Sequence, residues 1–330
     1  MVEYSILDYA LVDEGKNSED AVKETVELAK LADQLGFKRF WVTEHHNVPA
    51  FACPSPELLM MQMLSQTSSI RIGSGGVMLP HYSPFKVAEN MRMLEAFYPN
   101  RVDIGIGNNA GTPQVQAAMQ DRENAADNYL TSIHQLYEYL TNQQDEVIVQ
   151  PRNERTPEMW LLSIGERSAK TAAELGLGYT FGTFLLPDQA HIDQAQQSNR
   201  LYREQFKSSP IFSQSKVMAT TFIIVGENET HAEQLAHALG VWLLGKQSFA
   251  EFKQFPSIET AADYILTDEE KERIKAQRAS IIVGTEETIR PQIERLIEAN
   301  QADEVLFAPL ISDIETRRRT VKAIAKAMMS

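Results

Sequence analysis

Eight short apolar runs, rich in β-branched and aromatic residues, alternate along the chain with segments of helical periodicity. Such runs are typical of buried strands, and their alternation with helices is typical of a parallel sheet. We expect the strands at 4–7, 39–43, 70–78, 102–106, 159–162, 179–181, 216–225 and 303–307. Eight strand–helix units in 330 residues favour a closed (β/α)8 TIM barrel over an open sheet.

No linker rich in proline, glycine or serine divides the sequence, so we expect a single domain spanning 1–330. Residues 246–283 interrupt the alternation after the seventh strand and helix. Phe249, Phe252, Phe255 and Pro256 occur there among polar residues. We interpret 246–283 as an insertion lying over one end of the barrel, as a lid would.

The formal net charge of −14 opposes binding to nucleic acids or anionic membranes, whose phosphates require clustered lysine and arginine. A single cysteine, Cys53, excludes an intramolecular disulfide framework and fits a reducing compartment. The sequence shows neither a signal-peptide pattern at its start nor an apolar run of membrane-spanning length. We therefore expect a cytoplasmic protein.

The second strand ends abruptly in Glu44, His45 and His46. (β/α)8 barrels carry their active sites at the carboxyl ends of the strands, so this is a candidate site. Adjacent strand residues point to opposite faces, which makes chelation of one metal ion by both histidines unfavourable, and we expect no metal site. We interpret Glu44 and His46 as a hydrogen-bonded strand terminus and His45 as a candidate catalytic residue.

Two further segments are unusual, one inside the third strand and one after the fifth. Gly73, Gly75 and Gly76 lie inside the third strand, where each glycine costs about 0.5–1 kcal/mol relative to alanine. Either a flat group such as an aromatic cofactor approaches the backbone closely, or the barrel bends there. After the fifth strand, the loop 163–168 runs directly into a helix, so its amides, Arg167 and Ser168 are candidates for holding a phosphate.

Several segments together resemble the bacterial luciferase-like monooxygenases, in collinear order over nearly the whole chain. The most specific are the Glu44-His45-His46 strand end and the run Gly75-Gly76-Val77-Met78-Leu79-Pro80; the others are 98–107 and 283–287. The similarity is greatest to the non-luminous, single-gene branch of that family.

This resemblance implies a luciferase-like (β/α)8 barrel that takes reduced FMN from a separate flavin reductase and uses O2 to oxygenate a small organic substrate. It implies that His45 is catalytic, stabilising or protonating oxygen species on the flavin, a role suited to a group titrating near neutral pH. It also implies a cis peptide bond between Gly75 and Gly76 under the flavin ring, and phosphate binding by Ile164, Gly165 and Ser168.

The chain departs from the family at Asn108, where an arginine usually grips the cofactor phosphate. An amide brings no charge, so our hypothesis is that Arg167 supplies the missing cation. The expected cofactor contacts are Asp8, Gly75, Gly76, Val77, Asn108, Ser163, Ile164, Gly165, Arg167 and Ser168.

Two alternatives stay open: a flavin-binding protein without turnover, and an oxidoreductase that uses the deazaflavin F420. The substrate is not readable, although an apolar pocket above the flavin is a candidate for Tyr9, Phe51, Met78, His81, Tyr82, Phe184 and the phenylalanines of 249–255. The family also implies a homodimer through the helices beside strands two and three. Met60, Met61 and Met63 suit that interface or the barrel core equally.

Overall fold

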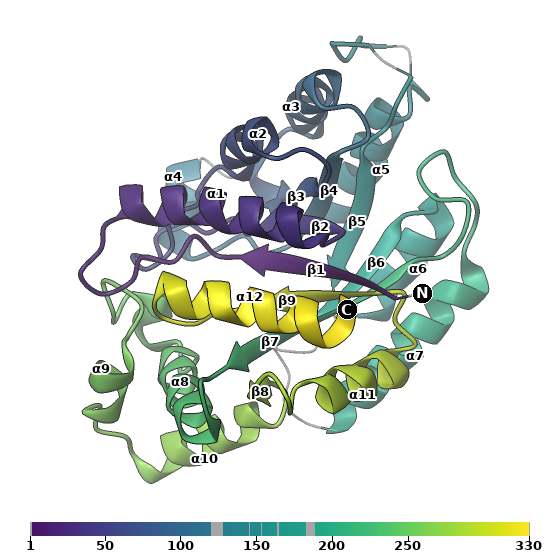
Figure 1. Ribbon diagram of the computed structural model, residues 1–330. Helices are drawn as coiled ribbons and strands as arrows, with labels where there is room; N and C mark the ends of the chain where they lie inside the picture. Colours follow the sequence, from purple (N-terminus) through teal and green to yellow (C-terminus); the bar gives the residue numbers. More distant parts are fainter. Residues whose placement is uncertain are drawn as a thin grey trace.

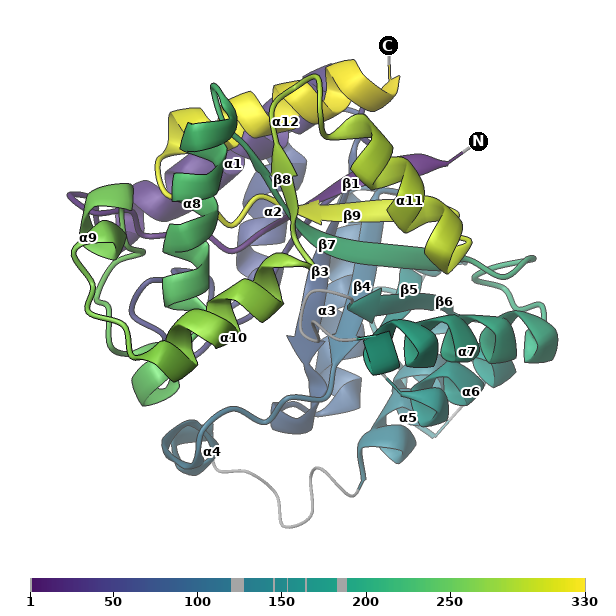
Figure 2. The ribbon, with the colours of Figure 1, turned by 90° about the horizontal axis from the view of Figure 1, so that it is seen from below.

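The computed structural model describes residues 2–329 except 120–127, 145, 153, 164 and 183–188. Parallel strands form a closed barrel surrounded by helices (Figure 1 and Figure 2). The barrel strands are β1 (Glu3–Asp8), β2 (Arg39–Val42), β3 (Arg71–Met78), β4 (Val102–Gly107), β5 (Glu158–Ser163), β6 (Gly178–Gly182), β7 (Val217–Val225) and β9 (Glu304–Ala308). The fold class and all eight expected strands are confirmed, with ends that shift by at most two residues.

A ninth strand, β8 (Ile282–Gly284), was not expected. It pairs in parallel with the last three residues of β7, beyond the part of β7 that contacts β9. Three residues are too few to show strand periodicity, so no local pattern indicates this strand.

Most helices lie outside the strands and follow them in alternation. They are α1 (Ser18–Leu35), α2 (Pro56–Gln66), α3 (Pro84–Phe97), α4 (Pro113–Met119), α5 (Tyr129–Leu140), α6 (Glu166–Leu175), α7 (Gln189–Gln205), α8 (Glu229–Trp242), α9 (Ile258–Ala262), α10 (Asp268–Arg278), α11 (Arg290–Asn300) and α12 (Ile314–Met329), with 3-10 turns η1 (Leu79–His81) and η3 (Lys246–Phe249). Local chemistry sets several ends: Asn17 and Asp20 form a capping box before α1, and Gly36 ends it in the left-handed region.

Alternation along each strand divides the core between two layers. In β1, Ile6 packs outward with residues of the surrounding helices, whereas Leu7 packs with Trp41 and Trp160 inside the barrel. All nine residues of β7 are buried. Both faces of such a strand are covered, which explains its continuous apolar sequence.

The N-terminal end of the barrel contains a buried ionic network around Arg39. Its guanidinium contacts the carboxylates of Asp103 at 2.7 Å, Glu304 at 2.7 Å and Glu158 at 3.0 Å. Asp103 also accepts a hydrogen bond from the Trp41 indole at 3.0 Å. The network lies at the opposite end of β2 from His45, the end of such barrels that serves stability.

Residues 246–283 contain η3, α9 and α10, which lie together with α8 at one side of the barrel (Figure 1 and Figure 2). The Phe255 amide donates to the Val12 carbonyl at 2.8 Å, and Ala261 packs in a small core with α8. None of the described helices combines the length and apolarity that a membrane span requires. The lid function of 246–283 stays a prediction.

Candidate functional site

His45 lies just beyond β2, at the carboxyl end of the barrel strands. Its amide donates to the Cys53 carbonyl at 3.1 Å, and its Nδ1 lies 2.9 Å from the Thr43 hydroxyl. The ring stacks on Tyr9, with 5.4 Å between centroids, and packs edge-to-face with Phe51, with 4.7 Å between centroids. Nδ1 is thereby fixed, whereas Nε2 has no hydrogen-bond partner among the described residues.

The aromatic surroundings change the acid–base behaviour of this imidazole. Burial disfavours the imidazolium, and the neighbouring His46 adds repulsion, so the pKa of His45 falls to about 4. The ring is therefore neutral at pH 7. This differs from the near-neutral titration that the resemblance implied, because neither the stacked Tyr9 nor Phe51 supplies a negative charge to hold the proton.

Glu44 and His46 form the strand terminus that the sequence predicted. The buried Glu44 carboxylate accepts hydrogen bonds from the Met78 amide at 2.9 Å and the Tyr82 hydroxyl at 2.6 Å. His46 Nε2 lies 2.8 Å from the same carboxylate. Through these hydrogen bonds, Glu44 and His46 connect the end of β2 with the end of β3.

The glycines of β3 meet the protein's own atoms. A Cβ at Gly73 would lie 2.5 Å from the Trp41 indole, one at Gly75 2.6 Å from Leu7, and one at Gly76 2.7 Å from the Gly105 carbonyl oxygen. Close packing against these neighbouring atoms thus leaves no room for a side chain at any of the three positions. The peptide bond between Gly75 and Gly76 is cis, as the resemblance implied.

Asp8 and Val77, both expected to contact the cofactor, face the outer layer. One carboxylate oxygen of Asp8 accepts hydrogen bonds from the Ala10 amide at 3.0 Å and the Thr25 hydroxyl of α1 at 2.6 Å. Val77 packs in the core between the sheet and the helices. Their contacts with a cofactor remain predictions.

The expected phosphate-binding residues gather at the exits of β4 and β5. These strands pair as far as Ile106 with Leu161, so Asn108 and Ser163 follow at the same edge. Asn108 and Arg167 are exposed, and Ser168 is half-buried. Ile164 lies outside the described residues.

The N-terminus of α6 has free space for a ligand. Among the described residues no side chain caps this helix, as is also true of α2, α3, α5 and α11, and the Gly165 amide donates to the Ser163 hydroxyl at 3.2 Å. A Cβ placed on Gly165 would meet no atom within 4 Å. Uncapped amides next to a guanidinium and a hydroxyl fit a phosphate group.

An aromatic wall continues from His45 away from β2. Phe51 contacts Trp242 at 5.4 Å, and Trp242 contacts Phe249 at 5.6 Å. Of the expected lining residues, those in this wall are Tyr9, Phe51, Phe249, Phe252 and Phe255, the last three through Trp242; Phe184 lies outside the described residues. Trp242 was missed, because nothing in the helical pattern of α8 shows which residues face the barrel end.

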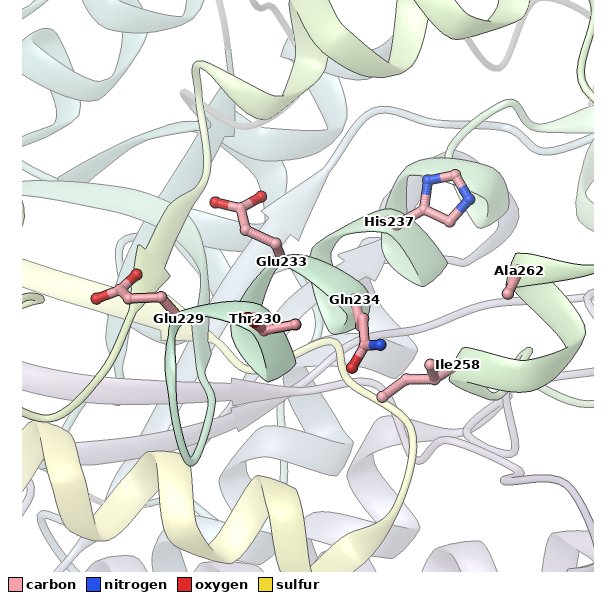
Figure 3. Close-up of a pocket in the computed structure, with 7 residues that line it drawn as sticks. All are labelled: Glu229, Thr230, Glu233, Gln234, His237, Ile258 and Ala262. Carbon is pink, nitrogen blue, oxygen red and sulfur yellow. The ribbon is translucent and has the colours of Figure 1, made fainter.

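A separate surface groove of about 520 Å³ lies between α8 and α9, away from this site (Figure 3). It is lined by Glu229, Thr230, Glu233, Gln234, His237, Ile258 and Ala262. Neither His45 nor Tyr9, Phe51 or Trp242 is among these lining residues. The cavity volume therefore does not mark the site that the strand ends define.

A closed parallel barrel with an imidazole, free helix amides and a cation at the carboxyl ends of its strands has the architecture of a barrel enzyme. The sequence profile described as luciferase-like monooxygenase matches residues 2–302. This chain therefore belongs to the luciferase-like monooxygenase family.

Similar proteins span the full length of the chain. It is 35% identical to the uncharacterized Bacillus subtilis protein YwcH over 99% of both chains. It is 28% identical to the N-acetyl-S-alkylcysteine monooxygenase of the same species, over 96% of this chain and 95% of that protein. The crystal structure of apo-MsnO8 superposes with a TM-score of 0.88 at 31% identity, covering 100% of this chain and 99% of the other.

More distant structures share the fold alone. They include the oxygenating constituent of 3,6-diketocamphane monooxygenase in complex with FMN, with a TM-score of 0.72 at 17% identity, covering 99% of this chain and 97% of that one. They also include an F420-dependent secondary alcohol dehydrogenase, with a TM-score of 0.66 at 16% identity, covering 98% and 99%. In those proteins, similar barrels hold FMN or F420.

Proposed function

We propose that this protein is a flavin-dependent monooxygenase that uses reduced FMN and O2 to oxygenate a small organic substrate. The observation that carries the proposal is the placement of a neutral His45, with a free Nε2, at the same barrel end as the uncapped N-terminus of α6. When bound, reduced FMN would supply the electrons that activate O2.

The phosphate of FMN would lie at the start of α6. Its binding would draw on the amides in the first turn of α6, the Ser168 hydroxyl and the guanidinium of Arg167. Asn108 offers an amide from the adjacent strand end but no charge. Arg167 is then the cation that compensates for the arginine usually present at position 108.

His45 would act by holding or delivering one proton at Nε2. The Thr43 hydroxyl fixes the other ring nitrogen, Tyr9 covers one face of the ring, and Phe51 packs beside it. A neutral imidazole accepts or donates a hydrogen bond at Nε2 depending on its tautomer. The contact with Thr43 keeps the ring in one orientation.

The substrate would lie against the aromatic wall formed by Tyr9, Phe51, Trp242 and Phe249. Residues 246–283 would cover that wall as a lid, since Phe249 belongs to it. We expect a separate flavin reductase to deliver reduced FMN. Cys53 is buried and free, in keeping with the cytoplasmic location that we propose.

We also propose a homodimer through α2 and α3, which lie side by side (Figure 1). Leu58 on α2 and Phe97 on α3 are 71% and 59% exposed, and Met93 is also exposed. Of the methionines considered, Met60 and Met63 are buried in the barrel core, so they cannot form the interface. A paired copy would cover the exposed apolar side chains.

Two other functions compete with this proposal, and specific observations favour the first of them. The exposed, uncharged Asn108 weakens the case for tight FMN binding, and the related barrel that holds F420 makes an F420-dependent oxidoreductase the second candidate. A flavin-binding protein without turnover is the third.

Binding and oxygen uptake distinguish these functions. We expect fluorescence quenching to show FMN binding and little binding of F420. With a flavin reductase and a panel of small organic compounds, we expect label from ¹⁸O2 in a product, lost in His45→Asn. Binding of F420 without FMN would support the second candidate. FMN binding with identical O2 uptake by His45→Asn and the parent would support the third.

A further inference from the structure

Glu44 joins the ends of two neighbouring strands through three polar contacts. One carboxylate oxygen accepts from the Met78 amide at 2.9 Å; the other accepts from the Tyr82 hydroxyl at 2.6 Å and lies 2.8 Å from His46 Nε2. The residue is only 4% exposed, so protein donors take the place of water around its charge. We call these four residues the Glu44 clamp.

The clamp lies where backbone pairing around β3 is interrupted. β2 pairs with β3 only as far as Val42 with Ser74. On its other side, β3 pairs with β4 as far as Ser74, and pairing resumes at Val77 after an irregularity. Gly75 and Gly76 therefore belong to neither register, and the contacts on either side of them determine where their peptide lies.

After Gly75 and Gly76, a hydrogen bond from the Met78 amide to the Glu44 carboxylate connects β3 with the residues that follow β2. Because Glu44 is bonded covalently to His45, the same side chain connects the candidate catalytic residue with the segment after the glycines. Backbone pairing between β2 and β3 ends at Ser74. Beyond that point, the Glu44 carboxylate links the two segments through one hydrogen bond from the Met78 amide.

We infer that Glu44 is a positioning residue, whose clamp sets the spacing between the His45 imidazole and the Gly75–Gly76 peptide. This inference rests on the proposed function, with the flavin ring placed at the Gly75–Gly76 peptide as the family resemblance implies. Glu44 does not itself reach the reacting atoms, because its carboxylate is directed to Met78, Tyr82 and His46.

The chain offers a matched control at the other end of β3. Asp33 accepts hydrogen bonds from the amides of Ser68 at 2.6 Å, Ser69 at 3.1 Å and Ile70 at 2.7 Å. Asp33 therefore ties the start of β3 as Glu44 ties its end. Loss of either carboxylate removes the same kind of contact, but only Glu44 adjoins the site.

The test compares Glu44→Ala, Glu44→Gln and Asp33→Asn for urea stability, FMN affinity, FMN-dependent O2 uptake and the NMR titration of His45 without flavin. We expect Glu44→Ala to lower kcat for O2 uptake about 100-fold, since small misplacements near reacting groups have effects of that size. We expect its His45 to titrate nearer the ordinary value as water enters. Glu44→Gln should recover part of both, and Asp33→Asn should change stability alone.

Folded Glu44→Ala that keeps the parent's kcat and His45 titration would show that the carboxylate is only a structural tie. If Glu44→Ala does not fold, Glu44→Gln and Tyr82→Phe, which removes one donor, carry the same comparison, and parental values in both overturn the inference. If the parent shows no FMN-dependent uptake, the proposed function fails. The His45 titration then still tests the inference about Glu44. If the titration of His45 is unchanged in the Glu44 variants, the inference is overturned.

Discussion

The imidazole of His45 and the phenol of Tyr9 lie nearly face to face, with 5.4 Å between ring centroids and 28° between ring planes. Stacking against a buried ring removes water from one face of the imidazole. The pKa of His45 consequently lies at about 4, well below its ordinary 6.5. The site is built to hold a neutral base rather than a cation.

This stacking predicts a loss of stability in mild acid. Between pH 6.5 and 4 the unfolded chain binds a proton at residue 45 that the folded protein does not, so the contribution of His45 is complete above pH 6.5 and declines as the pH falls toward 4. From pH 7 to pH 5, we expect the free energy of unfolding to fall by about 1–2 kcal/mol more in the parent than in His45→Asn. Urea titrations at both pH values measure the difference.

The control for this prediction is His134→Asn, which replaces an exposed histidine on α5. It should show the same pH dependence as the parent. Equal slopes for the parent and His45→Asn would mean that residue 45 titrates alike in both states, contrary to the stacked geometry.

Arg167→Ala should weaken FMN binding about 10- to 100-fold, because a hydrogen bond between a guanidinium and a phosphate contributes about 1.5–3 kcal/mol. Fluorescence quenching measures FMN affinity, and riboflavin, which lacks the phosphate, should bind the variant and the parent equally.

Lys170→Ala, one turn further along α6 and also exposed, is the matched control. It should bind FMN as the parent does. If Arg167→Ala also retains the parent's affinity, the idea that Arg167 compensates for Asn108 is wrong.

Arg39→Met should destabilise the fold by about 3–5 kcal/mol, because it leaves the buried carboxylates of Asp103 and Glu304 without their cation. The free energy of unfolding in urea at pH 7 tests this. Lys23→Met removes an exposed partner of Glu19, 4.0 Å away, and should cost no more than about 0.5 kcal/mol. Similar losses of unfolding free energy in the two variants would contradict the view that the buried network around Arg39 stabilises the fold more than an exposed ion pair does.

Phe97→Glu should convert the proposed dimer into a monomer, because it places a charge among the exposed apolar side chains of the proposed interface. Analytical ultracentrifugation of the parent and variant measures the change. Ile265→Glu alters a side chain that is 92% exposed beside α9 and should leave the assembly intact. A monomeric parent would remove the basis for the interface.

Much of the barrel could be predicted from local sequence. Strand length, apolar runs and helix-ending residues such as Gly36 depend on neighbours in the chain, so all eight barrel strands were found. The three-residue β8 was missed, because its pairing with β7 supplies the stability that its own length does not.

The sequence by itself determined the parallel barrel and the location of His45 at a strand end, because periodicity and strand direction are local properties. Only the tertiary structure decided the chemical state of that site. Tyr9, Phe51 and Trp242 are distant in sequence, yet they meet beside one imidazole and help to exclude water from it. Likewise, Arg39 finds Glu304 only because closure of the barrel brings β9 beside β1. Burial and long-range pairing are properties of the packed chain, and no local pattern encodes them.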